Sequence, residues 1–526
     1  MVTTEKLYKL ISTLQSAEKR YFKLLAARQE APSQQYMHLF QLMENSIARD
    51  AHDEPVFTLD EETLIIRLKR KGVPENQFHV VRYQLAQMLF KALRLMQEEH
   101  NKEGAIKILL KNAGLLERRG LFEWAEEMAE EALESAKTFD YHALSVEALY
   151  RLVNLRSQRD TLRYAEKLKD NLSEIIQISQ LFLTESTLFT LSYRALVTYR
   201  TIKGTRSTAS GDEIEELLNH PLLKIPPEST DSFWSQLYYC HAHATLSDLQ
   251  SGNQKAKLWF AKVVALWESD LFRHMQEERP RLFIVNLANY LNFSIAMGDF
   301  DAYDRHFKTL ENFKPSNSDD EAEVFQNIVF LQQLYYLNKG MPEEARKLIP
   351  SIEKGLKKYA FKINKSRLFS IRYHIILTYF VLAEYDKALL NCETLQKYGK
   401  SEQRRDLQLF VNILRNIAHL ELEEYEALQR FVKVVRSNLD QPLASPDFER
   451  IALTFLGRLA ELYLKHPTEN RLWQKILKPV LEEFLQALDH YAASGPPQLP
   501  MGFEEITLWI KSKLTGKPIR DIMTGK

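Results

Sequence analysis

The chain holds one cluster of soft metal ligands, Cys240-His241-Ala242-His243. On a helix, Cys240 and His243 would share a face, while His241 would lie about 100° away around the axis. A zinc site needs three or four ligands that converge on one point. The spacing therefore predicts packed helix residues rather than a metal centre.

Other residues that could do catalytic chemistry also lack the required context. Gly516-Lys517 has no earlier glycine of a phosphate-binding loop, and Cys392 occupies an apolar helix position where an inert buried thiol is expected. The carboxylates between Glu126 and Glu131 form a run, which we interpret as a solvated helix face and not as an acid–base pair. We therefore expect no catalytic residue, no metal and no cofactor, and predict that the protein is not an enzyme.

A local excess of positive charge lies between residues 61 and 97. Two helices are expected there, over 58–71 and 75–98, with Gly72-Val73-Pro74 as the turn between them. A basic helix followed by a tight turn and a second helix can be presented to nucleic acid, so one interpretation is a transcriptional or RNA-linked regulator. The favoured interpretation is the first hairpin of a helical array with a basic outer face, because the turn contains a proline and the second helix is long and rich in leucine and methionine. The formal net charge of zero also disfavours strong phosphate binding. The cationic residues concerned are Arg67, Lys69, Arg70 and Lys71.

All these residues belong to segments with helical periodicity, which runs through almost the whole chain. Between Ala125 and Leu133, apolar side chains recur at the i, i+3, i+4 and i+7 positions of an amphipathic helix. Glycine makes up 16 of 526 residues, half the usual share of ~7%. This scarcity disfavours β-sandwiches, propellers and glycine-rich phosphate loops. A single compact core is not expected at this length, which leaves several domains or an elongated repeat array.

Similar turn signals recur about 40–45 residues apart in the second half of the chain. In most copies an aromatic residue follows the turn, and small residues such as Ala125 come next. A tight turn of this kind joins two antiparallel helices, and the small residues let the second helix approach the first closely. The predicted turns are at Gly120, Gly252, Gly298, Gly340, Ala383 and Glu423.

The segment from Gly120 to Ala132, with Ala113 and Leu116 before it, resembles a tetratricopeptide repeat (TPR). The likeness extends over residues 105–440, although the period exceeds the ~34 residues of that family. Two terminal stretches, Ser16 to Phe22 and Ile506 to Lys513, also resemble long uncharacterised bacterial proteins of this kind. The resemblance implies an all-α fold, namely an elongated right-handed α-α solenoid of TPR-like helix hairpins with terminal capping helices.

The same pattern predicts three regions along the chain. Residues 1–100 form an N-terminal helical capping region, residues 101–445 the TPR-like repeats, and residues 446–526 a C-terminal helical capping region. Two cysteines cannot make a disulfide framework, and charges interrupt the N-terminus too early for a signal peptide. We therefore expect a cytoplasmic protein with no membrane partner.

In a solenoid of this kind, the first helix of each pair lines a concave surface that binds peptides or protein segments. Positions counted back from the turns predict the side chains that face this surface. The asparagine amides among them can bond both donors and acceptors of an extended backbone. We therefore predict a non-catalytic protein–protein interaction scaffold for a protein or peptide that the sequence does not name. The six predicted partner-binding residues are Lys107, Arg118, Asn292, Asn327, Asn338 and Tyr373.

Overall fold

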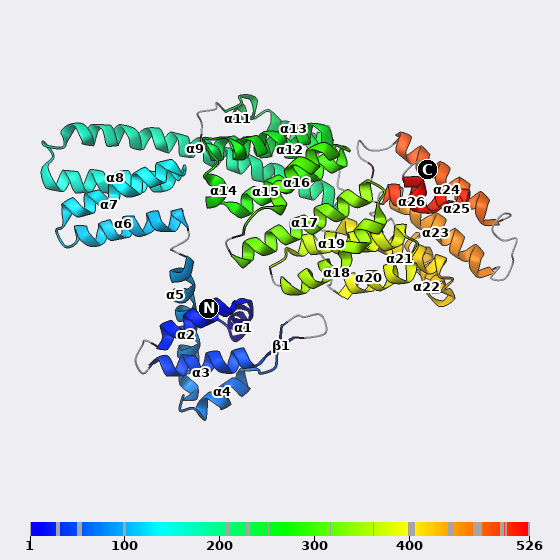
Figure 1. Cartoon of the computed structure of the whole chain (residues 1–526), viewed down its shortest axis with the longest axis horizontal. Helices are drawn as coiled ribbons and strands as arrows, with labels where there is room; N and C mark the ends of the chain where they lie inside the picture. Colours follow the sequence, from blue (N-terminus) through cyan, green and yellow to red (C-terminus); the bar gives the residue numbers. More distant parts are fainter. Residues whose placement is uncertain are drawn as a thin grey trace. The chain divides into compact units, whose positions relative to one another are not determined.

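The computed structural model describes most of the chain. The described residues are 2–27, 32–49, 55–97, 101–205, 211–227, 232–250, 252–315, 317–360, 362–397, 405–439, 447–465, 476–494, 499 and 502–523. Over these residues the fold is all-α, as predicted, and its one strand pairing is a short β-hairpin (Figure 1).

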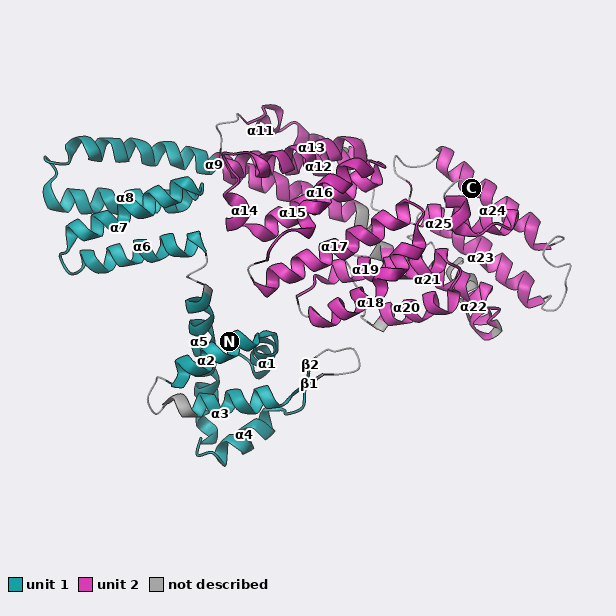
Figure 2. Ribbon diagram, viewed as in Figure 1, with its two compact units in different colours: residues 1–183 teal, residues 184–526 magenta. Residues whose placement is uncertain are grey.

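The chain divides into two compact units, residues 1–183 and 184–526 (Figure 2). The division falls inside one long helix, α9 (Ala165–Thr205), and within the region predicted to hold the repeats. Residues 100, 445 and 446, where we predicted boundaries, lie outside the described residues. The three-region scheme therefore stays a prediction.

Unit 1 begins with five α-helices, one 3₁₀ helix and the hairpin. These elements are α1 (Thr4–Thr13), α2 (Ser16–Ala27), α3 (Pro32–Asn45), β1 (Ile47–Arg49), β2 (Pro55–Phe57), α4 (Glu61–Lys69), the 3₁₀ helix η1 (Glu75–Gln77) and α5 (Phe78–Gln97). The strands are antiparallel, with Ile47 opposite Phe57. Buried apolar side chains from α1 to α5, including Leu7, Phe40 and Leu85, form one core.

Three further helices of unit 1 pack side by side along the chain: α6 (Lys102–Glu117), α7 (Phe122–Thr138) and α8 (His142–Asp160). Their contact is close because small residues line it. Ala113 on α6 and both Ala125 and Ala129 on α7 are completely buried in one cluster. This is the role that the sequence pattern predicts for the alanines after the turn.

Unit 2 contains the rest of the helices in chain order. They are α10 (Gly211–Leu218), α11 (Pro221–Lys224), α12 (Phe233–Gln250), α13 (Asn253–Glu268), α14 (Met275–Glu278), α15 (Pro280–Ala296), α16 (Phe300–Glu311), α17 (Ser318–Asn338), α18 (Pro342–Lys358), α19 (Lys365–Val381), α20 (Tyr385–Lys397), α21 (Arg405–Glu421), α22 (Tyr425–Leu439), α23 (Asp447–Lys465), α24 (Lys478–Ser494), α25 (Phe503–Thr515) and α26 (Ile519–Met523).

These helices form successive pairs. Helices α15, α17, α19, α21 and α23 pack one against the next, and α16, α18, α20 and α22 alternate with them along the chain (Figure 1). The largest apolar cluster runs from Leu337 on α17 to Ile519 on α26. The paired arrangement agrees with the expected array of hairpins, whereas its right-handed solenoid form stays a prediction.

All six predicted turns have left-handed backbone. The φ angles are 75° at Gly120, 77° at Gly252, 68° at Gly298, 68° at Gly340, 56° at Ala383 and 58° at Glu423. Most of them close a Schellman motif, in which an amide after the helix bonds a carbonyl five residues earlier. The Met341 amide donates to the Tyr336 carbonyl at 2.8 Å, and the Glu384 amide donates to Tyr379 at 2.9 Å. The sequence pattern missed a seventh turn, at Asp140, where φ is 54°.

Candidate interaction surfaces

The hairpin of α6 and α7 carries two of the predicted partner-binding residues on its surface. Lys107 is exposed on α6 and pairs with Glu103 at 2.5 Å, one helical turn earlier. Arg118 directly follows α6 and is also exposed. Its guanidinium makes no ion pair with any described residue, so it is available to a carboxylate of another molecule.

Large apolar side chains are exposed on the same hairpin. Trp124 on α7 is 53% exposed, and Leu115 and Leu121 are 43% and 47% exposed. The neighbouring Phe122 packs into the α6–α8 core instead. The repeat pattern assigns the plug of the turn to the aromatic two residues after the glycine, which is Phe122. It assigns no role to Trp124, so we did not predict Trp124 as a binding residue.

Asn327 does not line a surface, so this prediction is wrong as to its position. The residue is completely buried, and its amide donates to the Glu323 carbonyl at 2.8 Å and to the Glu323 carboxylate at 2.9 Å. Its Oδ1 accepts a hydrogen bond from Arg367 on α19 at 3.1 Å. The register of α17 turns this position toward the neighbouring first helix, where the amide satisfies buried polar groups.

Tyr373 is also buried, being 4% exposed, because a helix from the C-terminal region covers it. Its hydroxyl donates to Glu505 on α25 at 3.3 Å, and its ring packs edge-on against Phe410 on α21. Burial raises the pKa of Glu505 to about 7. Since α25 covers Tyr373, its side chain is not available to a partner in this structure. The prediction that it lines a binding surface is therefore wrong.

Helix α25 is fixed over this face by polar contacts as well as apolar ones. Glu421, the last residue of α21, accepts a hydrogen bond from the Trp509 indole at 2.7 Å and pairs with Lys513 at 2.5 Å. Arg520 on α26 pairs with Glu343 on α18 at 2.7 Å. The C-terminal helices thus pack along several hairpins, which is more than the end cap that we predicted.

The two remaining asparagines have partly free side chains. Asn338 is exposed and donates to the Leu334 carbonyl of its own helix at 2.8 Å, which leaves its Oδ1 open to solvent. Asn292 on α15 is half-buried and makes no side-chain hydrogen bond with the described residues. Their role in binding stays a prediction.

The basic hairpin consists of α4, the turn at Gly72 and α5. Arg67, Lys69, Arg70 and Lys71 are all exposed, and none forms an ion pair with a described residue. Asp60 caps the start of α4, where its side chain accepts from the Thr63 amide at 2.8 Å. Arg67 and Lys69 lie in the last turn of α4, and Arg70 and Lys71 directly follow it, where the helix dipole favours positive charge. Apolar side chains are exposed on the same two helices: Ile66, Val80 and Tyr83.

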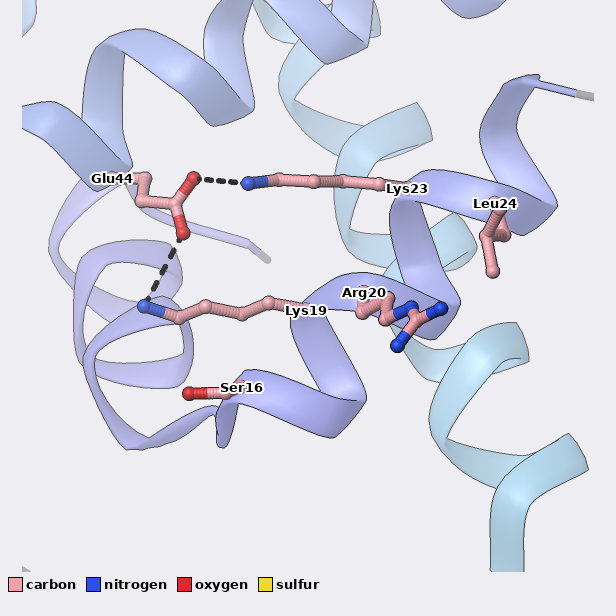
Figure 3. A pocket seen from close by; sticks show the side chains of 6 residues that line it. All are labelled: Ser16, Lys19, Arg20, Lys23, Leu24 and Glu44. Carbon is pink, nitrogen blue, oxygen red and sulfur yellow. Dashed lines mark hydrogen bonds and ion pairs between the residues drawn. The ribbon is translucent and has the colours of Figure 1, made fainter.

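A surface hollow of about 440 Å³ lies beside α2 and is rich in cations (Figure 3). Lys19 and Lys23 reach across to Glu44 on α3 at 3.4 Å and 2.8 Å, whereas Arg20 points away from that carboxylate. Since Glu44 neutralises part of the lysine charge, the hollow does not offer a converging set of donors for an anion.

The Cys240-His241-Ala242-His243 segment on α12 is packed as predicted. His241 Nε2 donates to Asn286 Oδ1 at 2.6 Å, and burial lowers the pKa of its imidazole to about 4. His243 stacks on Trp259 and donates to the Leu223 carbonyl at 2.9 Å. Both imidazoles therefore hold neighbouring elements together. Within the described ranges, no three His, Cys, Asp or Glu side chains are placed to share a metal ion.

Glu126 corrects our interpretation of the acidic run on α7. The residue is buried, and its carboxylate accepts from Arg156 Nε at 2.7 Å and from Arg159 at 2.6 Å, both on α8. Glu127 and Glu131 are exposed, as predicted. Glu130 also pairs with Arg156. The run is therefore a solvated face from which Glu126 and Glu130 join an ion-pair network between the two helices.

No family model, no curated protein and no solved structure matches this chain. None of the described helices combines the length and the apolar character that crossing a bilayer requires. The resemblance to tetratricopeptide repeats thus rests on the residues of the repeated turns.

Proposed function

We propose that this protein is a non-catalytic interaction scaffold, with TPR-like helix hairpins that bind a protein or peptide segment. We place it in the cytoplasm, where its free thiols Cys240 and Cys392 would stay reduced. The observation that carries the proposal is the exposure of Trp124 and Arg118 on the same hairpin.

These two residue types support the proposal because they dominate binding energy in protein interfaces. Tryptophan and arginine are enriched among interface residues whose truncation costs 2 kcal/mol or more. Leu115 and Leu121 add exposed apolar area around them. A partner that covers this hairpin would remove apolar surface from water and would supply a carboxylate for Arg118.

Affinity purification from the native cell tests the proposal. The tagged full-length chain is compared with Trp124→Ala, with Arg118→Ala and with the matched control Leu390→Ala, whose side chain is 62% exposed on α20. We expect the first two changes to reduce recovery of specific co-purifying proteins, by about 30-fold for a loss of ~2 kcal/mol. The control should leave recovery unchanged. Equal recovery with all four proteins would contradict the proposal.

A regulator that contacts nucleic acid is the second candidate. It is favoured by the four unpaired cations of the α4–α5 hairpin and by the exposed Tyr83, whose ring could stack on a base. A labelled DNA duplex and a single-stranded RNA are titrated at 50 and 200 mM salt. Neutralising Arg67, Lys69, Arg70 and Lys71 to glutamine should weaken binding and flatten its salt dependence. Absence of binding to the unmodified chain at 50 mM salt would eliminate this candidate.

A further inference from the structure

A hollow of about 320 Å³ opens between α16 and α17, and its floor is aromatic. The ring of Tyr303 on α16 stacks on Phe307 at 4.8 Å and on Tyr335 of α17 at 4.4 Å. The volume is at the small end of the range for ligand sites, which is enough for one side chain but not for a large cofactor.

The floor contains one polar group without a partner. Tyr303 is 3% exposed, and its hydroxyl makes no hydrogen bond to any described residue. A buried hydroxyl normally finds a partner, because leaving it unsatisfied costs free energy. In this hollow it would donate to a carbonyl oxygen of a bound molecule.

The rim of the hollow is acidic overall. Asp304 and Glu311 lie seven residues apart on the same side of α16, and both are exposed. Lys339, which directly follows α17, is the one cation among the lining residues. Its ammonium lies 4.5 Å from the centre of the Tyr335 ring and donates to the Tyr335 hydroxyl. Glu311 has no ion pair with a described residue, so one rim carboxylate is left for an added cation.

We propose that this hollow binds a cationic side chain of arginine type, presented by a peptide segment. A planar guanidinium stacks on tyrosine rings and pairs with carboxylates through several parallel donors. Its fit here comes from the ring floor, from Glu311 and Asp304 at the rim, and from Tyr303 as donor to the carbonyl of the bound residue. The hollow belongs to unit 2, whereas the α6–α7 hairpin that carries the proposed scaffold function belongs to unit 1. The site is therefore separate from the surface in the proposed scaffold function.

The test uses saturation-transfer difference NMR, which detects weak ligands of a large protein. The probes are N-acetyl-arginine N-methylamide and its norleucine and glutamate analogues, each added to the full-length chain. The variants are Tyr303→Phe, the double change Asp304→Asn with Glu311→Gln, Lys339→Met, and the matched control Asp301→Asn on the same helix. Each substitution is conservative in shape, so we expect the helix pair to stay folded.

We expect the arginine compound to bind best. The double change should weaken it about tenfold and Tyr303→Phe about fivefold, whereas Asp301→Asn should have no effect. Lys339→Met should strengthen it, because the competing ammonium is gone. Equal signals from the three compounds would overturn the proposal. So would preferred binding of the glutamate compound that disappears in Lys339→Met, since this would identify the hollow as an anion site.

Discussion

Ala383 and Gly298 occupy equivalent turns between paired helices, and exchanging their residue types should move stability in opposite directions. Both have left-handed backbone, with φ of 56° at Ala383 and 68° at Gly298. The Ala383 side chain is exposed, and a Cβ added to Gly298 would meet nothing within 4 Å. Ala383→Gly and Gly298→Ala therefore change the backbone preference and no packing.

The size of the effect follows from two opposing costs. An L-residue in the left-handed region costs about 1–2 kcal/mol, and glycine costs about 0.4–1 kcal/mol through the greater freedom of the unfolded chain. We expect Ala383→Gly to stabilise its turn by about 0.5–1 kcal/mol. Gly298→Ala should destabilise its turn by a similar amount.

Hydrogen exchange of the turn amides measures this directly. The Glu384 amide donates to the Tyr379 carbonyl at 2.9 Å, and the Asp299 amide donates to Ser294 at 2.9 Å. Exchange around Glu384 should slow about 2–5-fold in Ala383→Gly, and exchange around Asp299 should accelerate about 2–5-fold in Gly298→Ala. The control is Ala105→Gly at an exposed position inside α6, where glycine should destabilise the helix by about 1 kcal/mol.

Faster exchange around Glu384 in Ala383→Gly would refute the reasoning. It would mean that the greater freedom of glycine in the unfolded chain costs more than the left-handed backbone costs alanine at position 383.

Three further predictions concern the packing between helices. Arg156→Met should destabilise unit 1 by about 3 kcal/mol in urea unfolding, because it removes a partner of the buried Glu126 carboxylate. Adding Glu126→Gln removes that buried charge and should therefore recover part of the lost stability. Gly502→Ala should release α25 and accelerate its amide exchange, because φ is +88° and the new Cβ would lie 1.9 Å from the Phe410 ring. Burial raises the pKa of Glu505 from 4.5 to about 7, so the free energy of unfolding falls by up to about 3 kcal/mol as pH rises through this interval. In thermal unfolding, Glu505→Gln should therefore stabilise the chain at pH 8 but scarcely at pH 4.5.

The helical fold and its turns could be predicted because both depend on local sequence. A Schellman turn requires only a helix end and a residue that tolerates positive φ, and the aromatic and small residues that follow it recur in the sequence. Even Ala383 and Glu423, which are not glycines, were identified by this surrounding pattern. Asp140 was missed because it joins two successive pairs rather than the two helices of one pair.

The candidate site could be predicted only in part, because exposure depends on distant segments. Arg118 and Asn338 are exposed where counting from the turn places them. Asn327 faces a neighbouring helix whose register no local pattern reveals, and Tyr373 is covered by a helix more than one hundred residues later. The unpartnered hydroxyl of Tyr303 likewise becomes evident only when α16 and α17 are placed together.

Site-specific photo-crosslinking in the native cell tests the interaction scaffold most directly. A photoreactive phenylalanine derivative replaces Trp124 in one protein and the exposed Leu390 of α20 in another. We predict that the probe at position 124 forms a discrete crosslink to another protein and that the probe at position 390 does not. No crosslink at position 124, or the same products from both positions, would contradict the proposed role of the α6–α7 hairpin.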